Sequence, residues 1–283
     1  MSNLCKLFEV TGPPGGRTAY YRYRRGRSHN ADKKYNRPKH EVRIEFIRNS
    51  KRYGSRRIRE SLKQKGIKIG RRKVAEIMRR EGLKAIQPRK FIPRTTDSKH
   101  GKRICDNLLL DQPKPDRPNA VWVSDITYMP LKGGKWAYLC TWMDLYSRQI
   151  VGWQVADNMQ ESLVREPLER ALLKRRVKPG MVIHSDRGGQ YLSKNVKKLV
   201  KTFKLEQSMS RLDDPYDNAC AESLWSRIKA ELCMPKGGYE NLAKLKTILF
   251  EYIEGFYNNR RLHSSLNYLN PVAFETEYYR QTG

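Results

Sequence analysis

The sequence predicts an α/β fold in which a mixed five-stranded sheet carries helices on both faces, preceded by a small all-α domain. Two observations predict it. Residues 120–155 are rich in the aromatic and β-branched residues typical of strands, and amphipathic helices then alternate with short apolar strands. Residues 38–85 instead show helical periodicity, with glycines where helices would end. A chain of 283 residues is long enough for both units.

The positive charge is concentrated in the first part of the chain. The formal net charge is +29, and residues 1–118 hold 34 of the 58 Lys and Arg residues but 11 of the 29 acidic ones, a net of +23. This balance predicts a polyanionic partner, most commonly nucleic acid, although composition alone leaves a membrane-surface or ribosome-associated protein open. We interpret the chain as a basic arm (1–36), a DNA-binding domain (37–86), a proline-rich linker (87–118), a main domain (119–275) and a tail (276–283).

Composition also favours a reducing, aqueous environment. The five cysteines are scattered and form no CxxC pair, so reduced thiols are expected rather than a disulfide framework. No apolar run approaches the ~20 residues that span a bilayer. The N-terminus shows no signal-peptide pattern. We therefore expect a cytoplasmic protein.

Three helices are predicted between residues 38 and 85. The first has an apolar stripe of Val42, Phe46 and Ile47, and the second begins at the N-cap residue Ser55. The third runs from about Arg71 to Arg80 after a glycine-bounded turn, which indicates a helix-turn-helix. Because a recognition helix reads bases mainly from its first residues, the candidate DNA contacts are Arg71, Arg72, Lys73, Arg79 and Arg80. The alternative is a helical bundle with a solvated basic face.

The main domain begins with three strand-like segments, at Ala120–Met129, Lys135–Tyr146 and Arg148–Val155, with a hairpin turn at Gly133 and Gly134. The segments that follow are a helix (Glu161–Arg175), a strand (Met181–His184), a helix (Lys194–Phe203), a strand (Gln207–Ser210) and two helices (Asn218–Leu232 and Leu242–Asn258). This order of elements is the ribonuclease-H-like arrangement.

Three acidic residues stand out by their positions. Asp125 interrupts a hydrophobic strand, where an unpaired charge would be costly. Asp186 comes just after a strand, and carboxyl ends of strands are where α/β sites collect. Glu222 lies in the first turns of a helix. Each has an ordinary explanation alone, an ion pair or a favourable helix dipole, but together they form candidate metal-binding carboxylates.

Spacing strengthens this interpretation. Sixty residues separate Asp125 from Asp186, and 35 separate Asp186 from Glu222. Lys229 follows Glu222 by seven residues and Asn218 precedes it by four, so helical periodicity places all three on one face. We therefore place Lys229 and Asn218 beside Glu222 as candidate site residues.

The chain resembles the second reading frame of the insertion-sequence-three family of bacterial transposases, which carries an integrase-type catalytic core. The resemblance covers most of residues 40–275, including the helix-turn-helix. The segments that carry it are Trp122–Tyr128 (WVSDITY), Met143–Gly152 (MDLYSRQIVG), His184–Tyr191 (HSDRGGQY), Asp217–Glu231 (DNACAESLWSRIKAE) and Tyr257–Leu266 (YNNRRLHSSL).

The resemblance implies that Asp125, Asp186 and Glu222 are a catalytic triad and that Lys229 contacts the transposon end. It also implies strand transfer on double-stranded DNA, both terminal inverted repeats and target, with Mg²⁺ as cofactor and Mn²⁺ as a substitute. Two metal ions suit phosphodiester transfer, and we assign Asp125 as the bridging ligand. The implied first product is a circle formed by joining two element ends on one strand. Partners would be a second copy on paired ends and an upstream-frame protein or fusion, at the bacterial nucleoid.

Other polar residues have weaker claims. We interpret Arg260 and Arg261 as DNA-backbone contacts, with a solvated helix end as the alternative. Asp144 is favoured as a structural hydrogen-bonding group or ion-pair partner rather than a fourth metal ligand. His184 and His263 lack zinc-ligand spacing. The tryptophans are interpreted as core.

Two alternative functions remain open at this point. One is a DNA-binding module without catalysis, such as a repressor or a decayed relative, against which the intact triad argues. The other is a ribonuclease-H-like nuclease for hybrids or junctions. The 35-residue spacing, the helix-turn-helix and the basic first part argue against that nuclease.

Overall fold

A computed structural model describes residues 30–86, 105–110, 112–211 and 219–283, with the backbone alone described for 30–35 and 219–222. The predicted arm therefore lies largely outside the described residues, as does the linker up to residue 104. The chain divides into two compact units, residues 1–86 and 87–283.

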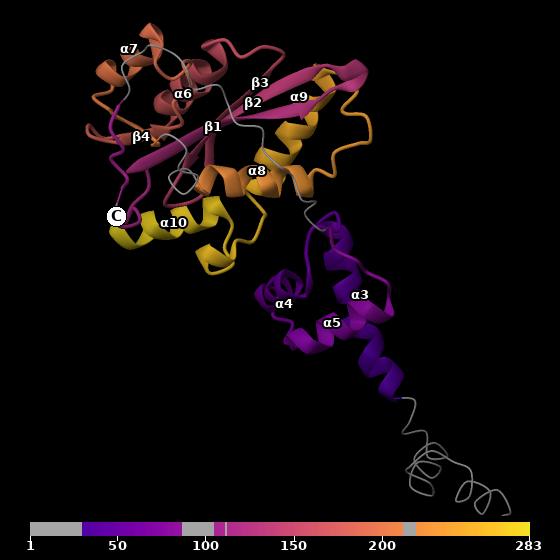
Figure 1. Cartoon of the computed structure of the whole chain (residues 1–283). Coiled ribbons are helices and arrows are strands. Elements are labelled where there is room, and N and C mark those ends of the chain that lie inside the picture. The colour runs from indigo at the N-terminus through magenta and orange to yellow at the C-terminus, as the bar shows by residue number, and fades with distance from the viewer. Residues whose placement is uncertain (1–29, 87–104, 111, 212–218) are drawn as a thin grey trace, which may run out of the picture. The chain divides into compact units, whose positions relative to one another are not determined.

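The first unit contains three helices, α3 (Asn30–Arg48), α4 (Ser55–Gln64) and α5 (Arg71–Arg80) (Figure 1). Its core is formed by Val42, Phe46, Ile58, Leu62, Val74 and Ile77, all nearly inaccessible to solvent. The three predicted helices are confirmed, but α3 begins seven residues before the predicted boundary at 37. The prediction that Ile47 belongs to the buried stripe is wrong, because its side chain is 59% exposed.

A buried carboxylate ties α3 to α4. Glu45 accepts hydrogen bonds from Asn49 (2.9 Å) and Ser61 (2.6 Å) and forms an ion pair with Lys65. Burial alone would raise the pKa of Glu45, but the bonds from Lys65, Ser61 and Asn49 outweigh it and lower the pKa. Ionised Glu45 therefore stabilises the packing of the two helices.

The lowered pKa of Glu45 predicts acid-sensitive stability in this unit. A depressed folded pKa contributes stability that is complete above the ordinary value of 4.5 and is lost as the pH falls through the folded value. We expect Glu45→Gln to reduce hydrogen-exchange protection of α3 and α4 near neutral pH. That deficit relative to the unchanged chain should disappear as the pH falls below the lowered pKa of Glu45. Glu41→Gln, one turn earlier on α3, is the control, and an equal loss in both variants would contradict the prediction.

The second unit is built on a five-stranded sheet with the order β3-β2-β1-β4-β5. Its strands are β1 (Val121–Pro130), β2 (Trp136–Asp144), β3 (Ile150–Ala156), β4 (Val182–Ser185) and β5 (Glu206–Met209). β1 pairs antiparallel with β2 and parallel with β4, so the sheet is mixed, as predicted. Gly133 and Gly134 adopt positive φ angles at the β1–β2 connection, which only glycine adopts readily.

Helices cover both faces of this sheet (Figure 1). α6 (Ser162–Lys174) packs on β2 and β3, and α7 (Lys194–Thr202) packs beside α6. On the other face, α8 (Ala219–Glu231) packs against β1 and α9 (Leu242–Phe250) against β3. The main apolar cluster fills the α6 side and includes Trp122, Trp142 and Leu168.

The C-terminal part differs from the prediction. The expected helix over 242–258 is α-helical only to Phe250 and continues as a π-helical segment over Glu251–Tyr257. Helix α10 (Pro271–Thr282), which begins at the N-cap Asn270, then runs through the predicted boundary between main domain and tail. Its Phe274 and Tyr278 pack on Tyr146, so α10 belongs to the core domain.

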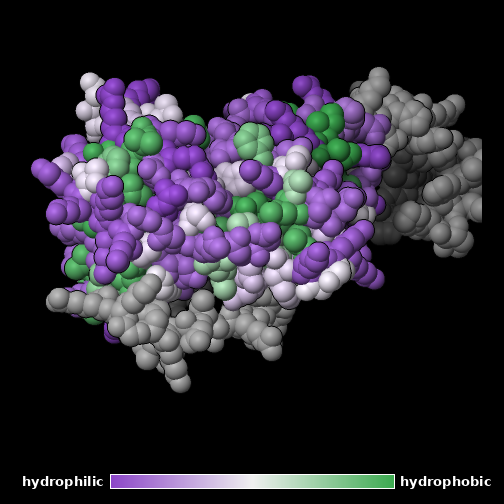
Figure 2. Space-filling view, turned by 90° about the horizontal axis from the view of Figure 1, so that it is seen from above, coloured by the Kyte–Doolittle hydropathy of each residue, from purple (hydrophilic) through white to green (hydrophobic). Residues whose placement is uncertain are grey.

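The surface is mostly hydrophilic. Figure 2 shows one face, on which apolar side chains gather only in small patches. Within the described part of the chain, no helix is both long and apolar enough to cross a lipid bilayer.

Candidate active site

Asp125 lies on the central strand β1, on the side that faces α8. Its neighbours Trp122 and Ser124 face the α6 side, since successive strand residues alternate between faces and Ser124 meets the buried Tyr191 there. The Asp125 carboxylate is half-buried and held at both oxygens. Oδ1 accepts from the Ile126 amide at 2.7 Å, and Oδ2 accepts from the Trp225 indole at 2.9 Å.

Asp186 follows the end of the neighbouring parallel strand β4. The β1–β4 pairing ends with Val123 opposite His184, so Asp125 and Asp186 each lie two residues beyond the last paired position. Neighbouring strands lie about 4.8 Å apart, so this register brings the two carboxylates to one edge of the sheet. Among the described side chains, Asp125 and Asp186 are the residues suited to hold a divalent cation, because carboxylate oxygens are its preferred ligands.

The charges of both carboxylates help to raise the pKa values of two buried side chains. Burial raises the pKa of the Cys140 thiol to about 12, and the negative charges of Asp125 and Asp186 contribute to the rise. Burial also raises the pKa of Tyr191, whose hydroxyl lies 2.9 Å from Ser124 Oγ, and both carboxylates add to that shift. These groups stay neutral and lie on the α6 side of the sheet, opposite the side that Asp125 faces.

Gly188 has no side chain and so leaves space for the Asp186 carboxylate. Asp186 Oδ1 accepts the Gly188 amide at 3.0 Å, closing a tight turn after β4. A Cβ atom at position 188 would lie 3.0 Å from the same Oδ1 and 3.1 Å from Gln190 Oε1. A side chain at position 188 would therefore be in tight contact with the carboxylate, which accounts for the glycine.

Lys229 on α8 also lies near Asp125. Its side chain is 7% exposed, and burial lowers its pKa to about 8 while Asp125 opposes the shift. Lys229 and Trp225 are four residues apart and therefore share one face of α8. That face is turned toward Asp125, which places a positive charge and an indole donor beside the carboxylate.

Two predicted site residues cannot be placed. Position 222 belongs to helix α8, but the side chain of Glu222 lies outside the described atoms, and Asn218 lies outside the described residues. Within the side chains that are described, no cluster of three His, Cys, Asp or Glu residues is close enough to hold a metal ion. The structure thus brings together Asp125, Asp186 and Lys229.

The candidate DNA contacts of the first unit lie on α5. Arg71, Arg72, Arg79 and Arg80 are exposed, and Lys73 is partly so. Lys73 and Arg80 both form ion pairs with Glu76, at 3.2 and 2.8 Å. The helix therefore presents cations at both ends, with one acid between them.

The structure places the two predicted DNA contacts Arg260 and Arg261 in different environments. Arg260 is exposed, but Arg261 is 1% exposed and donates to Glu231 through Nε and a terminal nitrogen. The interpretation of Arg261 as a DNA-backbone contact is therefore wrong, because its guanidinium is enclosed by the core and already paired. Adjacent residues at a helix end can differ in burial, and the sequence alone did not show which of Arg260 and Arg261 is buried.

Asp144 and His184 have structural partners. Asp144 is fully buried and accepts backbone N–H groups from Asn119 (2.6 Å), Tyr146 (2.9 Å) and Ser147 (2.9 Å), which confirms a structural hydrogen-bonding role. His184 is buried between Ser208 and Ser210, at 2.8 and 3.1 Å.

The hydrogen bond from the Trp225 indole to Asp125 was not predicted from the sequence. The side chain of Trp225 is 7% exposed, as expected for core, yet its indole N–H reaches Asp125. The signal was available, because Trp225 follows Glu222 by three residues and precedes Lys229 by four, so helical periodicity puts all three positions on one face.

Three family profiles match the chain. An HTH-like domain matches residues 35–91, and two integrase core domain profiles match residues 115–215 and 204–271. The second and third together cover β1, β4 and α8, the elements that carry the candidate site.

Curated relatives match along most of their length. A 31 kDa protein of insertion element IS600 from Shigella sonnei is 34% identical over 98% of this chain and 99% of its own. The IS904 transposase of Lactococcus lactis is 36% identical over 83% of this chain and 91% of its own. The InsF transposase of IS3A from Escherichia coli is 36% identical over 82% and 80%. Among solved structures, the BIV integrase catalytic core matches 58% of this chain and 98% of its own, with a TM-score of 0.43 and 16% identity.

Proposed function

The chain belongs to the IS3 family of transposases, and from this premise we propose that Asp125, Asp186 and Glu222 are the catalytic carboxylates with which it cleaves and joins DNA. Membership makes the chain a DNA-binding polynucleotidyl transferase with an integrase core. We propose the identity of the catalytic residues, of the metal and of the assembly.

One observation carries the assignment of residues. β1, β4 and α8 converge near Asp125: Asp125 and Asp186 each lie two residues beyond the last β1–β4 pair, Trp225 donates to Asp125, and the charge of Asp125 acts on the pKa of Lys229. Position 222 shares the helix face of Trp225 and Lys229 by periodicity. This supports Glu222 as the third carboxylate.

The donor set fits Mg²⁺, with Mn²⁺ as a substitute. The carboxylate oxygens of Asp125 and Asp186 are hard ligands, and both side chains are partly exposed, as a substrate-binding metal site requires. Asp125 would bridge two ions, with Asp186 and Glu222 each completing one of them. Bound there, the pair of ions would activate the attacking oxygen and stabilise the leaving oxygen.

The residues of the chain prepare this arrangement. The bonds from Ile126 and Trp225 fix the orientation of the Asp125 carboxylate, and Gly188 fixes that of Asp186. Preorganised ligands avoid reorganisation during the reaction. Lys229 supplies a positive charge beside Asp125, where it would contact a phosphate of the transposon end.

Two in-line displacements account for the reaction. Water attacks a phosphodiester at the element's end, the P–O bond to the 3′ oxygen breaks, and a 3′-hydroxyl is released. That hydroxyl then attacks a second phosphodiester, forming a new P–O bond as another 3′ oxygen leaves. No covalent intermediate with the protein is required. The first joining connects the two ends on one strand and leads to a circle.

DNA recognition is assigned to the first unit. Arg71, Arg72 and Lys73 would enter a groove or grip phosphates at the start of α5, with Arg79 and Arg80 on the flanking backbone. Asn218 and the exposed Arg260 are further proposed contacts. Because two ends must be joined, we propose a homodimer on paired ends, with an upstream-frame protein or fusion as partner.

The Asp125→Asn variant tests the assignment. On a duplex carrying the element's end, strand cleavage should be lost while binding of that duplex persists. A variant that still cleaves would remove Asp125 from the catalytic set.

Trp225 should act as a positioning residue for Asp125. Trp225→Phe keeps an aromatic side chain but removes the 2.9 Å bond to Oδ2. A hydrogen bond to a charged group contributes about 1.5–3 kcal/mol, so we expect cleavage to slow by about 10- to 100-fold. The rate should fall without a matching loss of end binding, and Trp153→Phe, whose indole donates to Glu254 away from Asp125, serves as the matched control. Equal rates in the two variants would contradict the prediction.

A further inference from the structure

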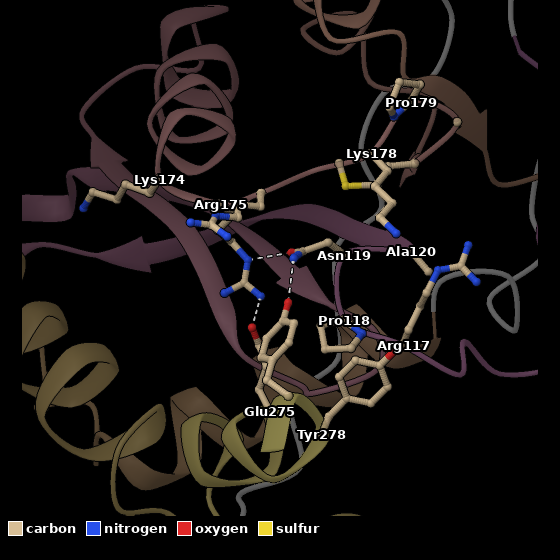
Figure 3. Close-up of a pocket in the computed structure, with 14 residues that line it drawn as sticks. Arg117, Pro118, Asn119, Ala120, Lys174, Arg175, Lys178, Pro179, Glu275 and Tyr278 are labelled. Atoms are coloured by element: carbon tan, nitrogen blue, oxygen red, sulfur yellow. Dashed lines mark hydrogen bonds and ion pairs between the residues drawn. The ribbon is translucent and has the colours of Figure 1, made fainter. Parts of the chain in front are cut away.

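A cavity of about 570 Å³ lies in the core domain at the edge of the sheet opposite the carboxylates (Figure 3). It is lined by the segment before β1, by the loop that follows α6 and by α10. β1 and β4 both start here, at Val121 and Val182, whereas Asp125 lies in the middle of β1 and Asp186 follows the end of β4. Four residue steps of about 3.3 Å along β1 put Asp125 about 13 Å from Val121, so the cavity is separate from the candidate active site.

Cations dominate the lining. Arg117, Lys174, Arg176 and Lys178 are exposed around it, and within the described residues Lys174, Arg176 and Lys178 form no ion pair. Arg117 lies 3.4 Å from the exposed Asp116. A helix C-terminus attracts cations, which accounts for Lys174 at the end of α6. It does not account for Arg117 or Lys178, which come from other segments.

The floor of the cavity is rigid. Arg175 donates to Asn119 (2.6 Å) and Gln149 (3.0 Å) and pairs with Glu275 of α10. Asn119 in turn contacts the Tyr279 hydroxyl at 3.4 Å (Figure 3). This internal pair neutralises the one buried acid of the lining, so the charge left at the mouth is strongly positive.

Tyrosines form the α10 side of the cavity. Tyr278 and Tyr279 contact each other edge to face, and Tyr279 is 50% exposed. Cations interleaved with exposed aromatic rings are typical of nucleic-acid surfaces, where the cations hold phosphates. The cations come from three separate segments and not from one helix or strand that could enter a groove, so we expect them to contact the backbone irrespective of sequence.

We propose that this cavity binds the phosphate backbone of duplex DNA, as a second DNA contact on the core domain distinct from the carboxylate edge. The proposal rests on the proposed function, because it assumes that the core acts on DNA. A sequence-independent contact suits a reaction in which a second, unrelated duplex must be held while an element end occupies the active site.

Lysine footprinting on the full-length chain tests the proposal directly. The chain is acetylated briefly with and without a duplex, and the modification of each lysine is measured by mass spectrometry. We expect duplex DNA to protect Lys174 and Lys178 several-fold, equally for an element end and for a random sequence. Lys244 and Lys246, exposed on α9 outside the cavity, are the reference pair and should react at nearly unchanged rates.

A matched pair of variants adds an energetic measurement. Arg176→Gln with Lys178→Gln should lower the slope of log affinity against log salt by about 2, since each phosphate contact contributes roughly 0.9. Lys244→Gln with Lys246→Gln removes the same charge and should leave the slope nearly unchanged.

The outcomes separate this proposal from the proposed function. If the chain binds DNA and cleaves an end but Lys174 and Lys178 are no better protected than the reference pair, the cavity proposal is overturned while the function stands. Protection by RNA but not by duplex DNA would also overturn it. If Asp125→Asn cleaves normally while Lys174 and Lys178 are protected, the catalytic assignment fails and the cavity proposal survives.

Discussion

Replacing Asp125 by Asn should abolish strand cleavage and strand transfer, with a loss of at least about 10³-fold. Asn is nearly isosteric, and its one carbonyl oxygen can still accept from either Ile126 or Trp225, although not from both. It removes the negative charge that would bind a divalent cation. Chemistry should therefore be lost while the fold and the affinity for the element's end stay close to those of the unchanged chain.

Three measurements make this prediction specific. Cleavage and joining are followed on a labelled duplex, binding by gel shift, and Mn²⁺ binding by calorimetry. Asp157→Asn is the matched control, because Asp157 is exposed and bonds only its neighbour Asn158 in the described structure. A variant at position 125 that binds Mn²⁺ and cleaves as well as the control would refute the role of this carboxylate.

The fold was predictable because its signals are local. Runs of aromatic, β-branched and apolar residues located the five strands to within two residues, and caps such as Ser193 and Asn270 follow ordinary N-cap chemistry. Helix α10 was not predicted, although Asn270 and Pro271 mark its start. The π-helical turn over Glu251–Tyr257 has no sequence signal that periodicity could detect.

The site was predictable to the extent that spacing encodes it. The positions of Asp125 and Asp186 follow from the strand pattern, but only the parallel register of β1 with β4 brings them together. The burial of Arg261 could not be read from the sequence, since it depends on Glu231, thirty residues earlier. The cationic cavity was missed for the same reason: Arg117 and Lys178 are far apart along the chain.

Replacing Glu231 by Ala should strongly destabilise the core domain, because it removes the ion-pair partner of the buried Arg261. Glu231 ends α8 and accepts from Arg261 and from the Tyr252 hydroxyl (2.9 Å), while Arg261 also lies over the Tyr257 ring. The carboxylate raises the pKa of Arg261 against the effect of burial. Without Glu231, a permanent positive charge remains in the core.

Removing one partner of a buried ion pair costs about 3–5 kcal/mol. For a domain of this size each kcal/mol lowers Tm by about 2–4 °C, so we expect a fall of roughly 6–20 °C in calorimetry. Glu277→Ala is the matched control, because Glu277 also makes two hydrogen bonds to one arginine, Arg280, but on the exposed surface of α10. That variant should melt with the unchanged chain.

A double variant decides whether the pair itself or the uncompensated charge matters. Glu231→Leu with Arg261→Met replaces both charges by apolar groups, and should recover most of the lost stability because no charge is left buried. Glu231→Ala melting together with Glu277→Ala would show that Arg261 reaches solvent, and would reopen its interpretation as a DNA contact. Since α8 also carries Trp225, Lys229 and position 222, a loosened C-terminal end should slow cleavage as well, which ties the stability of this buried pair to the geometry of the carboxylates.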